Sequence, residues 1–196
     1  MPVALLEPLE SPPRKRWTRS ECEVLDASGL LAGQRFELID GELINAMGKN
    51  SPHVIGVLLF HRWLVSVFGF LQVQQEASID VAPKDNELNE PEPDLVVLRM
   101  SRTQVTEGNP KPENVLLAVE VSDTTLSFDL TKKAQLYARA GIPDYWVLDV
   151  NKRRLIVHRE PLGGNYTSVL VYRDTESIAP LAAPESAFHV AAAFEE

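Results

Sequence analysis

Residues 114–121 read NVLLAVEV and residues 145–150 read YWVLDV, and both are nearly continuous apolar runs. Runs of this length are typical of central strands that are buried on both faces of a sheet. Between them, residues 129–140 carry apolar side chains at helical spacing, and Gly141 with Pro143 beyond it marks the end of that helix. Strand, helix and strand in this order predict an α/β (α+β) fold, with a mixed β-sheet core flanked by helices.

The segments before this unit predict a short helix and a hairpin. Thr18 and Glu21 match a capping box, which indicates a helix over residues 19–27. Residues 35–47 read as two short strands around Asp40-Gly41, a hairpin turn signal. Further strands are predicted over residues 71–81, 94–99, 154–159 and 166–172.

A long helix is predicted after the hairpin. We expect Ser51 to cap it with Pro52 at its first position, and Gly69 to end it after about Phe68. Its apolar face is expected to include Val54, Leu58, Val65 and Phe68. The longest apolar stretch, residues 54–71, is interrupted by two basic side chains and falls short of the ~20 residues that span a bilayer. We therefore expect no membrane association.

Composition predicts one domain. The chain has 196 residues, of which 44% are hydrophobic and 24% charged, as in ordinary globular proteins. Residues 1–17 hold four prolines and the run Arg14-Lys15-Arg16, which predicts an irregular arm before a domain at 18–196. The single cysteine, Cys22, cannot form an internal disulfide, and the N-terminus lacks a signal-peptide pattern, so we expect the cytoplasm.

The net charge of −9 counts against a nonspecific nucleic-acid binder, because such proteins carry a basic footprint. It does not exclude a nuclease. A site built from carboxylates is itself acidic until a metal ion fills it.

Two carboxylates lie against apolar runs. Asp94 immediately precedes the run LVVL at 95–98, and Glu120 interrupts NVLLAVEV. If these strands pair antiparallel across the polar turn region 101–113, both acids lie at the same end of the sheet. Oxygen ligands suit Mg²⁺ or Mn²⁺, and the backbone carbonyl of Val121 is a third candidate ligand. Each acid taken singly reads more readily as a strand-end residue paired with a basic neighbour, but their joint placement favours a metal site.

Lys133 is the third candidate. It flanks the apolar stripe of the predicted helix 129–140, whereas Lys132 falls on the side expected to face solvent. An ammonium leaning toward the sheet can position an attacking water and stabilise charge in a phosphoryl transition state. Spacing alone leaves open an Asp129–Lys133 surface pair.

Several stretches together resemble the Uma-two family of restriction-endonuclease-like proteins, which belongs to the PD-(D/E)XK nuclease superfamily. They are PEPDLVVL, LLAVEVSDTT and DLTKKAQLYARAGIPDYWVLD, preceded by RFELIDGELINAM and SPHVIGVLL. The resemblance covers roughly residues 18–175. It implies a restriction-endonuclease-like sheet, a divalent metal, and cleavage of phosphodiester bonds in nucleic acid, with DNA foremost. A homodimer is also expected.

The resemblance assigns metal binding to Asp94 and Glu120. Ser122 stands where the superfamily has its lysine, and the family pattern moves that lysine to Lys133. Two residues match more loosely. Glu42 is a candidate for the metal cluster or a plain turn carboxylate, and His53 is a candidate for contacting substrate phosphate or orienting a ligand, or a plain polar residue of the first helical turn.

Two function classes follow. The first is a Mg²⁺- or Mn²⁺-dependent DNA endonuclease. The second is a catalytically inactive nuclease-like module that binds nucleic acid or protein, favoured by the acidic charge and by Ser122. A different hydrolase is disfavoured, because the chain has no G-x-S-x-G elbow, no zinc-type H-E-x-x-H and no P-loop.

Overall fold

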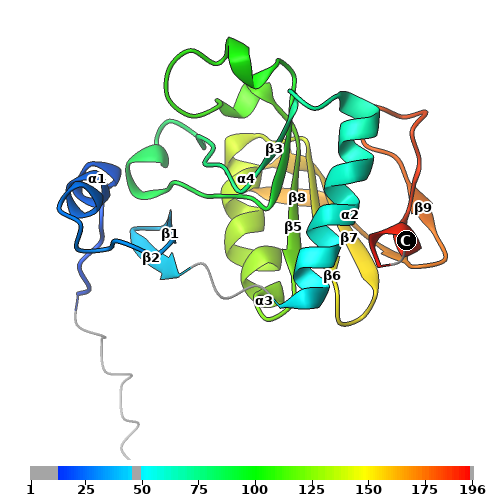
Figure 1. Ribbon diagram of the computed structural model, residues 1–196, viewed down its shortest axis with the longest axis horizontal. Helices are drawn as coiled ribbons and strands as arrows, with labels where there is room; N and C mark the ends of the chain where they lie inside the picture. The colour runs from blue at the N-terminus through cyan, green and yellow to red at the C-terminus, as the bar shows by residue number, and fades with distance from the viewer. Residues whose placement is uncertain (1–12, 46–49, 195–196) are drawn as a thin grey trace, which may run out of the picture.

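A six-stranded mixed sheet forms the centre of the fold, with helices on both of its faces (Figure 1). The structure, a computed structural model, describes residues 13–45 and 50–194. The strand order is β3-β4-β5-β6-β7-β8, and all neighbours pair antiparallel except β5 and β6. The strands are β3 (Val73–Gln75), β4 (Leu95–Leu98), β5 (Val115–Ser122), β6 (Asp144–Asp149), β7 (Arg154–Leu162) and β8 (Asn165–Arg173).

The two apolar runs are the central strands β5 and β6, so that prediction is confirmed. Parallel neighbours need a crossover, and α3 (Leu126–Phe128), η4 (Asp129–Lys133, a π-helix) and α4 (Ala134–Ala140) supply it. The helix therefore begins before the expected residue 129. Tyr145 and Trp146 are fully buried on the two faces of the sheet, as expected of packing residues.

Helix α2 (Ser51–Phe68) covers the opposite face from α3–α4 and packs on the largest of three core clusters. By length and composition it would pass as a membrane span, but its stripe of Val57, Phe60 and Leu64 is buried against the sheet. The expected apolar face was partly wrong. Val54 and Leu58 are 40% and 55% exposed, because the helix is rotated to turn the stripe 57-60-64 inward.

Gly56 belongs to this inward stripe and sets how closely α2 approaches the sheet. A Cβ added there would lie 3.1 Å from Val121 Cγ1 and 3.2 Å from Leu148 Cδ2. The missing side chain lets the first turns of α2 lie against the C-terminal ends of β5 and β6. The start of α2 is thereby held beside the sheet end where Asp94 and Glu120 were expected.

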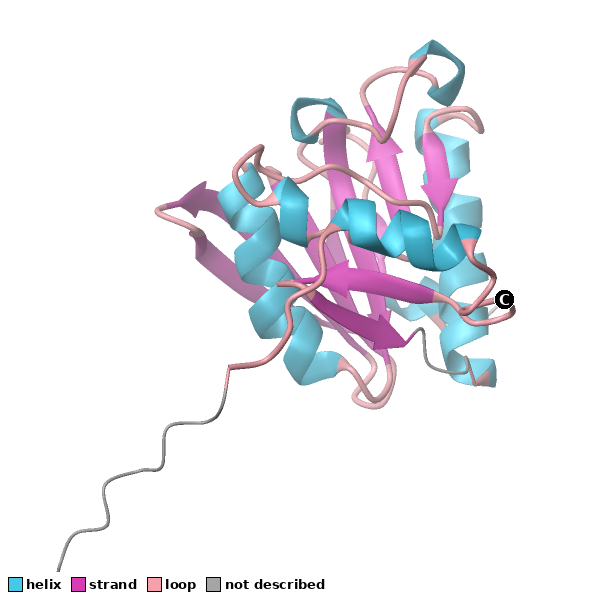
Figure 2. Ribbon diagram, turned by 90° about the vertical axis from the view of Figure 1, so that its left-hand side faces the viewer, coloured by secondary structure: helices cyan, strands magenta, loops and turns pink. Residues whose placement is uncertain are grey.

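The N-terminal elements form a separate layer beside the sheet. They are α1 (Arg19–Ala27), with the predicted Thr18–Glu21 capping box, and a hairpin of β1 (Phe36–Ile39) and β2 (Glu42–Asn45). Figure 2 looks onto this side, with α1 and the hairpin in front of the sheet. Asp40 and Gly41 both have positive φ, 51° and 79°, as the turn signal predicted.

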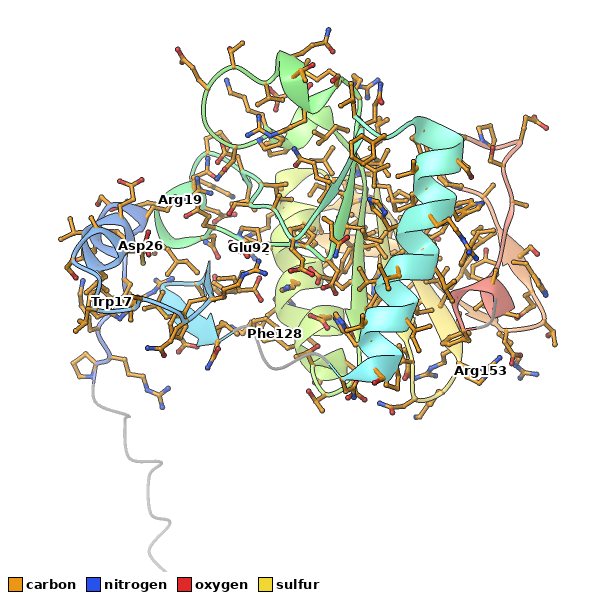
Figure 3. The ribbon with its side chains drawn as sticks, in the orientation of Figure 1. Trp17, Arg19, Asp26, Glu92, Phe128 and Arg153 are labelled. Atoms are coloured by element: carbon orange, nitrogen blue, oxygen red, sulfur yellow. The ribbon has the colours of Figure 1, made fainter. Side chains whose placement is uncertain are left out.

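Backbone pairing and ion pairs tie this layer to the core. Leu38 bridges Glu90, and Arg19 Nη1 lies 2.6 Å from Asp80 Oδ1. Figure 3 shows Arg19 on the inner side of α1 and Glu92 between the hairpin and the sheet. Of the predicted arm 1–17, residues 1–12 lie outside the described ranges, and 13–17 carry no helix or strand.

The remaining elements are short. The predicted strand 71–81 was too long, because Glu76 takes a positive φ of 49° directly after β3 and ends the pairing. The tail packs back on the α2 face through Phe188, Val190 and Ala193. The short elements are η1 (Asn86–Leu88), η2 (Arg102–Gln104), η3 (Pro112–Asn114), β9 (Ser177–Ile178), β10 (Phe188–His189) and η5 (Val190–Ala193).

Candidate active site

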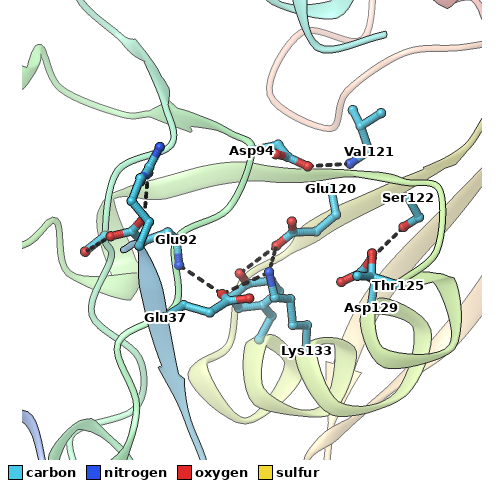
Figure 4. A network of polar contacts seen from close by, with 12 residues as sticks. Glu37, Glu92, Asp94, Glu120, Val121, Ser122, Thr125, Asp129 and Lys133 are labelled. Atoms are coloured by element: carbon cyan, nitrogen blue, oxygen red, sulfur yellow. Dashed lines mark hydrogen bonds and ion pairs between the residues drawn. The ribbon is translucent and has the colours of Figure 1, made fainter. Parts of the chain in front are cut away.

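Asp94 and Glu120 meet at one end of the sheet. β4 and β5 pair antiparallel with Leu95 opposite Val119, which confirms the predicted pairing. Asp94 Oδ2 accepts a hydrogen bond from the Val121 backbone N–H at 2.8 Å (Figure 4). Extending this register by one residue places Asp94 directly opposite Glu120, at the start of β4 and near the end of β5.

The Val121 carbonyl faces the same place. In a strand, the N–H and C=O of one residue point to the same side, and here that side is the start of β4. Extending the register by two residues brings Val121 opposite Pro93. Proline has no N–H, so it offers this carbonyl no ladder donor. The carbonyl is thus suited to be a ligand.

Glu120 is 4% exposed, and both of the hydrogen bonds that described residues make to its carboxylate go to the same oxygen, Oε1. Lys133 Nζ and Tyr137 Oη each donate to Glu120 Oε1 at 3.0 Å. Among the described residues, no hydrogen bond reaches Oε2. Because Glu120 also lines the cleft at this sheet end, Oε2 is the oxygen left for a ligand there.

Lys133 points toward the sheet and Lys132 away from it, as predicted. Lys133 is buried and lies 3.0 Å from both Glu120 Oε1 and Glu37 Oε2, whereas Lys132 is exposed and pairs with Asp40 at 3.3 Å. Figure 4 shows Lys133 between the two glutamates. Its ammonium has three N–H donors. Glu37 and Glu120 take two of these donors, and Lys133 also lines the cleft.

The π-helix η4 places Lys133. The backbone N–H of Ala134 bonds to the carbonyl of Asp129, five residues back. Such turns are rare and are often found at functional sites. Ser122 Oγ and Thr125 Oγ1 donate to Asp129 Oδ2 at 2.6 and 2.7 Å, which fixes the start of this turn. The surface pair between Asp129 and Lys133, left open by spacing, is therefore wrong, because Asp129 is buried and bonded to these hydroxyls.

Burial and crowding set the charge state of this cluster. Burial raises the pKa of Glu120, Lys133 opposes that rise, and the neighbouring acids Asp129, Asp94 and Glu37 add to it. Burial likewise raises the pKa of Glu37. Burial also disfavours the charged form of Lys133, but the surrounding carboxylates outweigh it and raise the pKa of Lys133, so the side chain is an ammonium at neutral pH. Glu37 and Glu120 therefore share one buried ammonium, that of Lys133.

His53 lies in the first turn of α2 and approaches Asp94. The distance from His53 Nε2 to Asp94 Oδ2 is 3.3 Å. The helix cap is Asn50 and not Ser51 as predicted, because the Asn50 side chain accepts the His53 backbone N–H at 3.1 Å and Ser51 is already helical. His53 is thus close enough to Asp94 to orient it.

Glu42 does not reach the cluster. It is exposed, and Arg14 Nη1 lies 3.9 Å from its Oε1. The hairpin instead turns Glu37 toward Lys133. The sequence signal for Glu37 was available, since an acid inside the otherwise apolar strand FELI resembles the placement of Glu120. Tyr137, expected only as part of an apolar stripe, is the other missed member of the site.

A cleft of about 130 Å³ opens at this cluster. Its basic side chains are Arg35, His53 and Lys133. Its acidic side chains are more numerous: Glu37, Glu76, Glu92, Asp94, Glu120, Asp123 and Asp129. The cleft is thus strongly acidic, which suits a cation and opposes a bare polyanion.

The donor set fits a hard cation bound through few protein ligands. Within residues 13–45 and 50–194, no three His, Cys, Asp or Glu side chains gather as a ready metal cage. Mg²⁺ commonly uses one or two carboxylates and keeps several waters. Asp94, Glu120 and the Val121 carbonyl match that requirement. Burial and, to a lesser degree, the neighbouring acids raise the pKa of Glu120, and a bound cation would stabilise its charged form.

Comparison with known proteins places the chain in a family. The Uma2 family, described as "Putative restriction endonuclease", matches residues 23–192, which confirms the resemblance seen in the sequence. A solved structure titled as a putative nuclease belonging to DUF820 from Anabaena variabilis ATCC 29413 has a TM-score of 0.61 and 15% identity, covering 81% of this chain and 89% of that chain. At that identity the likeness shows the shared fold alone. No curated protein matches. Because the family match spans most of the chain, this protein belongs to the Uma2 family.

Proposed function

We propose that this protein is a divalent-metal-dependent endonuclease that hydrolyses phosphodiester bonds of DNA. One observation carries the proposal. The ammonium of Lys133 lies 3.0 Å from Glu120 Oε1, at the sheet end where Asp94 and the Val121 carbonyl also face the cleft. Metal-dependent phosphodiester hydrolysis uses carboxylates that bind a divalent cation and a positively charged side chain that stabilises the transition state.

Asp94, Glu120 and the Val121 carbonyl would hold Mg²⁺ or Mn²⁺. The metal would supply Lewis-acid activation and neutralise the phosphate. Tyr137 fixes Glu120 through its hydroxyl at 3.0 Å, and His53 orients Asp94 at 3.3 Å. Lys133 directs its remaining N–H to a water or a phosphoryl oxygen, where it holds the nucleophile or stabilises developing negative charge. The enzyme would act in the cytoplasm, and a homodimer would suit cleavage of both strands.

The acidic cleft favours one alternative. A cleft with seven lining carboxylates and a lysine already paired to two of them is also what a nuclease-like binding module without activity would show. Calorimetry with Mn²⁺ separates the two. The nuclease proposal expects Mn²⁺ binding that is lost in Glu120→Gln and kept in Glu113→Gln, an exposed acid before β5.

Cleavage itself tests the proposal. Supercoiled plasmid is incubated with Mg²⁺ or Mn²⁺ and either the natural protein or Asp94→Ala, purified side by side. We expect nicking by the natural protein that Asp94→Ala and EDTA both abolish. Equal nicking by the two proteins would mean that the activity comes from a contaminant or another site, and the proposal would fail.

A further inference from the structure

Lys133 is held by two carboxylates, and only one of them belongs to the expected metal site. Its Nζ lies 3.0 Å from Glu37 Oε2 and 3.0 Å from Glu120 Oε1. Side chains of all three residues are at least 86% buried, with exposed fractions of 14% for Glu37 and 5% for each of the others. A metal ion bound by Glu120 would weaken its attraction for the ammonium. Glu37 would then be the main anionic partner left to Lys133.

Glu37 is itself held from the segment that carries Asp94. Its Oε2 accepts a hydrogen bond from the Glu92 backbone N–H at 3.3 Å, two residues before Asp94. The backbone of its neighbour Leu38 pairs with Glu90 in the same segment, with Glu90 N–H donating to the Leu38 carbonyl at 2.7 Å. The hairpin is therefore fastened to the 90–94 segment at the point where Glu37 reaches inward (Figure 4).

Glu37 is engaged by Lys133 and is not grouped with the two acids proposed to hold the metal. The part of the chain that the structure describes holds no metal-binding group of three His, Cys, Asp or Glu side chains, so Glu37 does not complete one with Asp94 and Glu120. Its Oε2 is committed to the ammonium and to a backbone N–H. Glu37 is thus tied to Lys133 and to the segment that carries Asp94.

We infer that Glu37 is a positioning residue, which keeps the Lys133 ammonium over the cleft when a divalent cation occupies Glu120. The inference rests on the proposed function, because it assigns Lys133 a task only in the metal-bound protein. It extends that proposal to a residue on the hairpin, outside the core sheet. The hairpin thereby becomes part of the proposed active site.

The test measures how readily the amine of Lys133 reacts with an external reagent. Proteins saturated with Mg²⁺ are treated with an amine-acetylating reagent, and labelling of each lysine is followed by mass spectrometry. We compare the natural protein with Glu37→Ala, the isosteric Glu37→Gln, and Glu42→Gln, an exposed acid on the same hairpin. Lys132, 59% exposed, serves as the internal reference.

We expect Lys133 to label several-fold faster in Glu37→Ala than in the natural protein, with Glu37→Gln between them and Glu42→Gln unchanged. Unchanged Lys133 labelling in both Glu37 variants would overturn the inference. If Glu37→Ala does not fold, Glu37→Gln alone decides, because its amide keeps the shape but loses the charge.

Two further readouts separate this inference from the proposed function. In cleavage assays we expect the Glu37 variants to lower kcat roughly 10–100-fold with KM nearly unchanged, as for other positioning groups around metal sites. If Mn²⁺ affinity in Glu37→Gln falls as far as in Glu120→Gln, Glu37 is a ligand and the inference is wrong. Absence of cleavage by the natural protein would remove the proposed function, while the labelling result would still decide the role of Glu37.

Discussion

Lys133 Nζ and Glu120 Oε1 lie 3.0 Å apart, although 13 positions separate the two residues and they stand on a helix and a strand. The crossover produces this contact, because β5 leads into α3 and η4, which fold back over the end of the strand. Ser122, which occupies the position where the superfamily has lysine, donates to Asp129 and so anchors the turn that carries Lys133. Ser122 thus supports the turn that carries Lys133, the residue that we propose takes the role of that lysine.

Lys133→Met should separate charge stabilisation from metal binding. Methionine fills a similar volume without the ammonium, and loss of a single transition-state donor typically costs about 10²–10³ in kcat. We expect a loss of that size in single-turnover cleavage. Mn²⁺ affinity should be retained, because without the lysine the carboxylate of Glu120 has no competing ammonium. Lys132→Met is the matched control. A Lys133→Met protein that cleaves at the natural rate would show that the ammonium has no part in the reaction.

Glu120 should make the metal-free protein less stable as pH rises. Burial and neighbouring acids raise the pKa of Glu120 above its ordinary value of 4.5, so the folded state holds this proton more tightly than the unfolded state does. The stabilisation is then complete below pH 4.5 and is lost as pH rises through the raised pKa. We expect thermal melts in EDTA to show a steeper decline in stability with pH for the natural protein than for Glu120→Gln.

Addition of Mg²⁺ provides the control for that measurement. A cation that binds only the folded state raises the melting temperature at pH 8. This rise should occur in the natural protein and be absent in Glu120→Gln. Identical pH profiles for the two proteins in EDTA would contradict the assignment of the raised pKa to Glu120.

His53 should act through Asp94. Removing a partner that orients a metal ligand typically weakens metal affinity or activity about 10–100-fold. We therefore expect His53→Ala to weaken Mn²⁺ binding by that order, measured by calorimetry, and His53→Gln to restore part of it through a hydrogen bond to Asp94. His61→Ala, farther along the same helix, should have no effect. If His53→Ala binds Mn²⁺ normally but raises KM for DNA, the residue contacts substrate instead.

Gly56 should be intolerant of larger side chains. A Cβ at this position already lies 3.1 Å from Val121 and 3.2 Å from Leu148, so a valine would push α2 off the sheet. Overpacking of this kind costs about 1–3 kcal/mol. We expect Gly56→Val to lose stability of that order in urea unfolding and to lower activity, because α2 also carries His53. Ser66→Val, on an exposed turn of the same helix, should leave both unchanged.

Local patterns in the sequence were sufficient for the core and for part of the site. β5 and β6 were predictable because both faces are buried, so their apolar runs are broken only at Glu120 and at Asp149. The meeting of Asp94 with the end of β5 followed from antiparallel pairing across a turn. Lys133 could be preferred to Lys132 because helical spacing fixes which side of a helix a residue occupies.

Features that depend on contacts between distant segments were not predictable. Glu37 belongs to the site because the hairpin pairs with the segment at Glu90, a contact that no pattern within the hairpin encodes. Glu42 was favoured over it by a loose match to the family pattern after the turn. The inward face of α2 was also missed, because the helix is apolar on several sides and only Gly56 and its packing against Val121 select one of them.

The central claim is that Asp94 and Glu120 hold a divalent cation beneath Lys133. The most direct test is anomalous diffraction from crystals of the natural protein soaked in Mn²⁺. We predict a peak at about 2.0–2.2 Å from oxygens of Asp94 and Glu120 and from the Val121 carbonyl, as expected for Mg²⁺-type coordination. A fully soaked crystal with no peak between these two carboxylates, or with its peak elsewhere in the cleft, would contradict the claim.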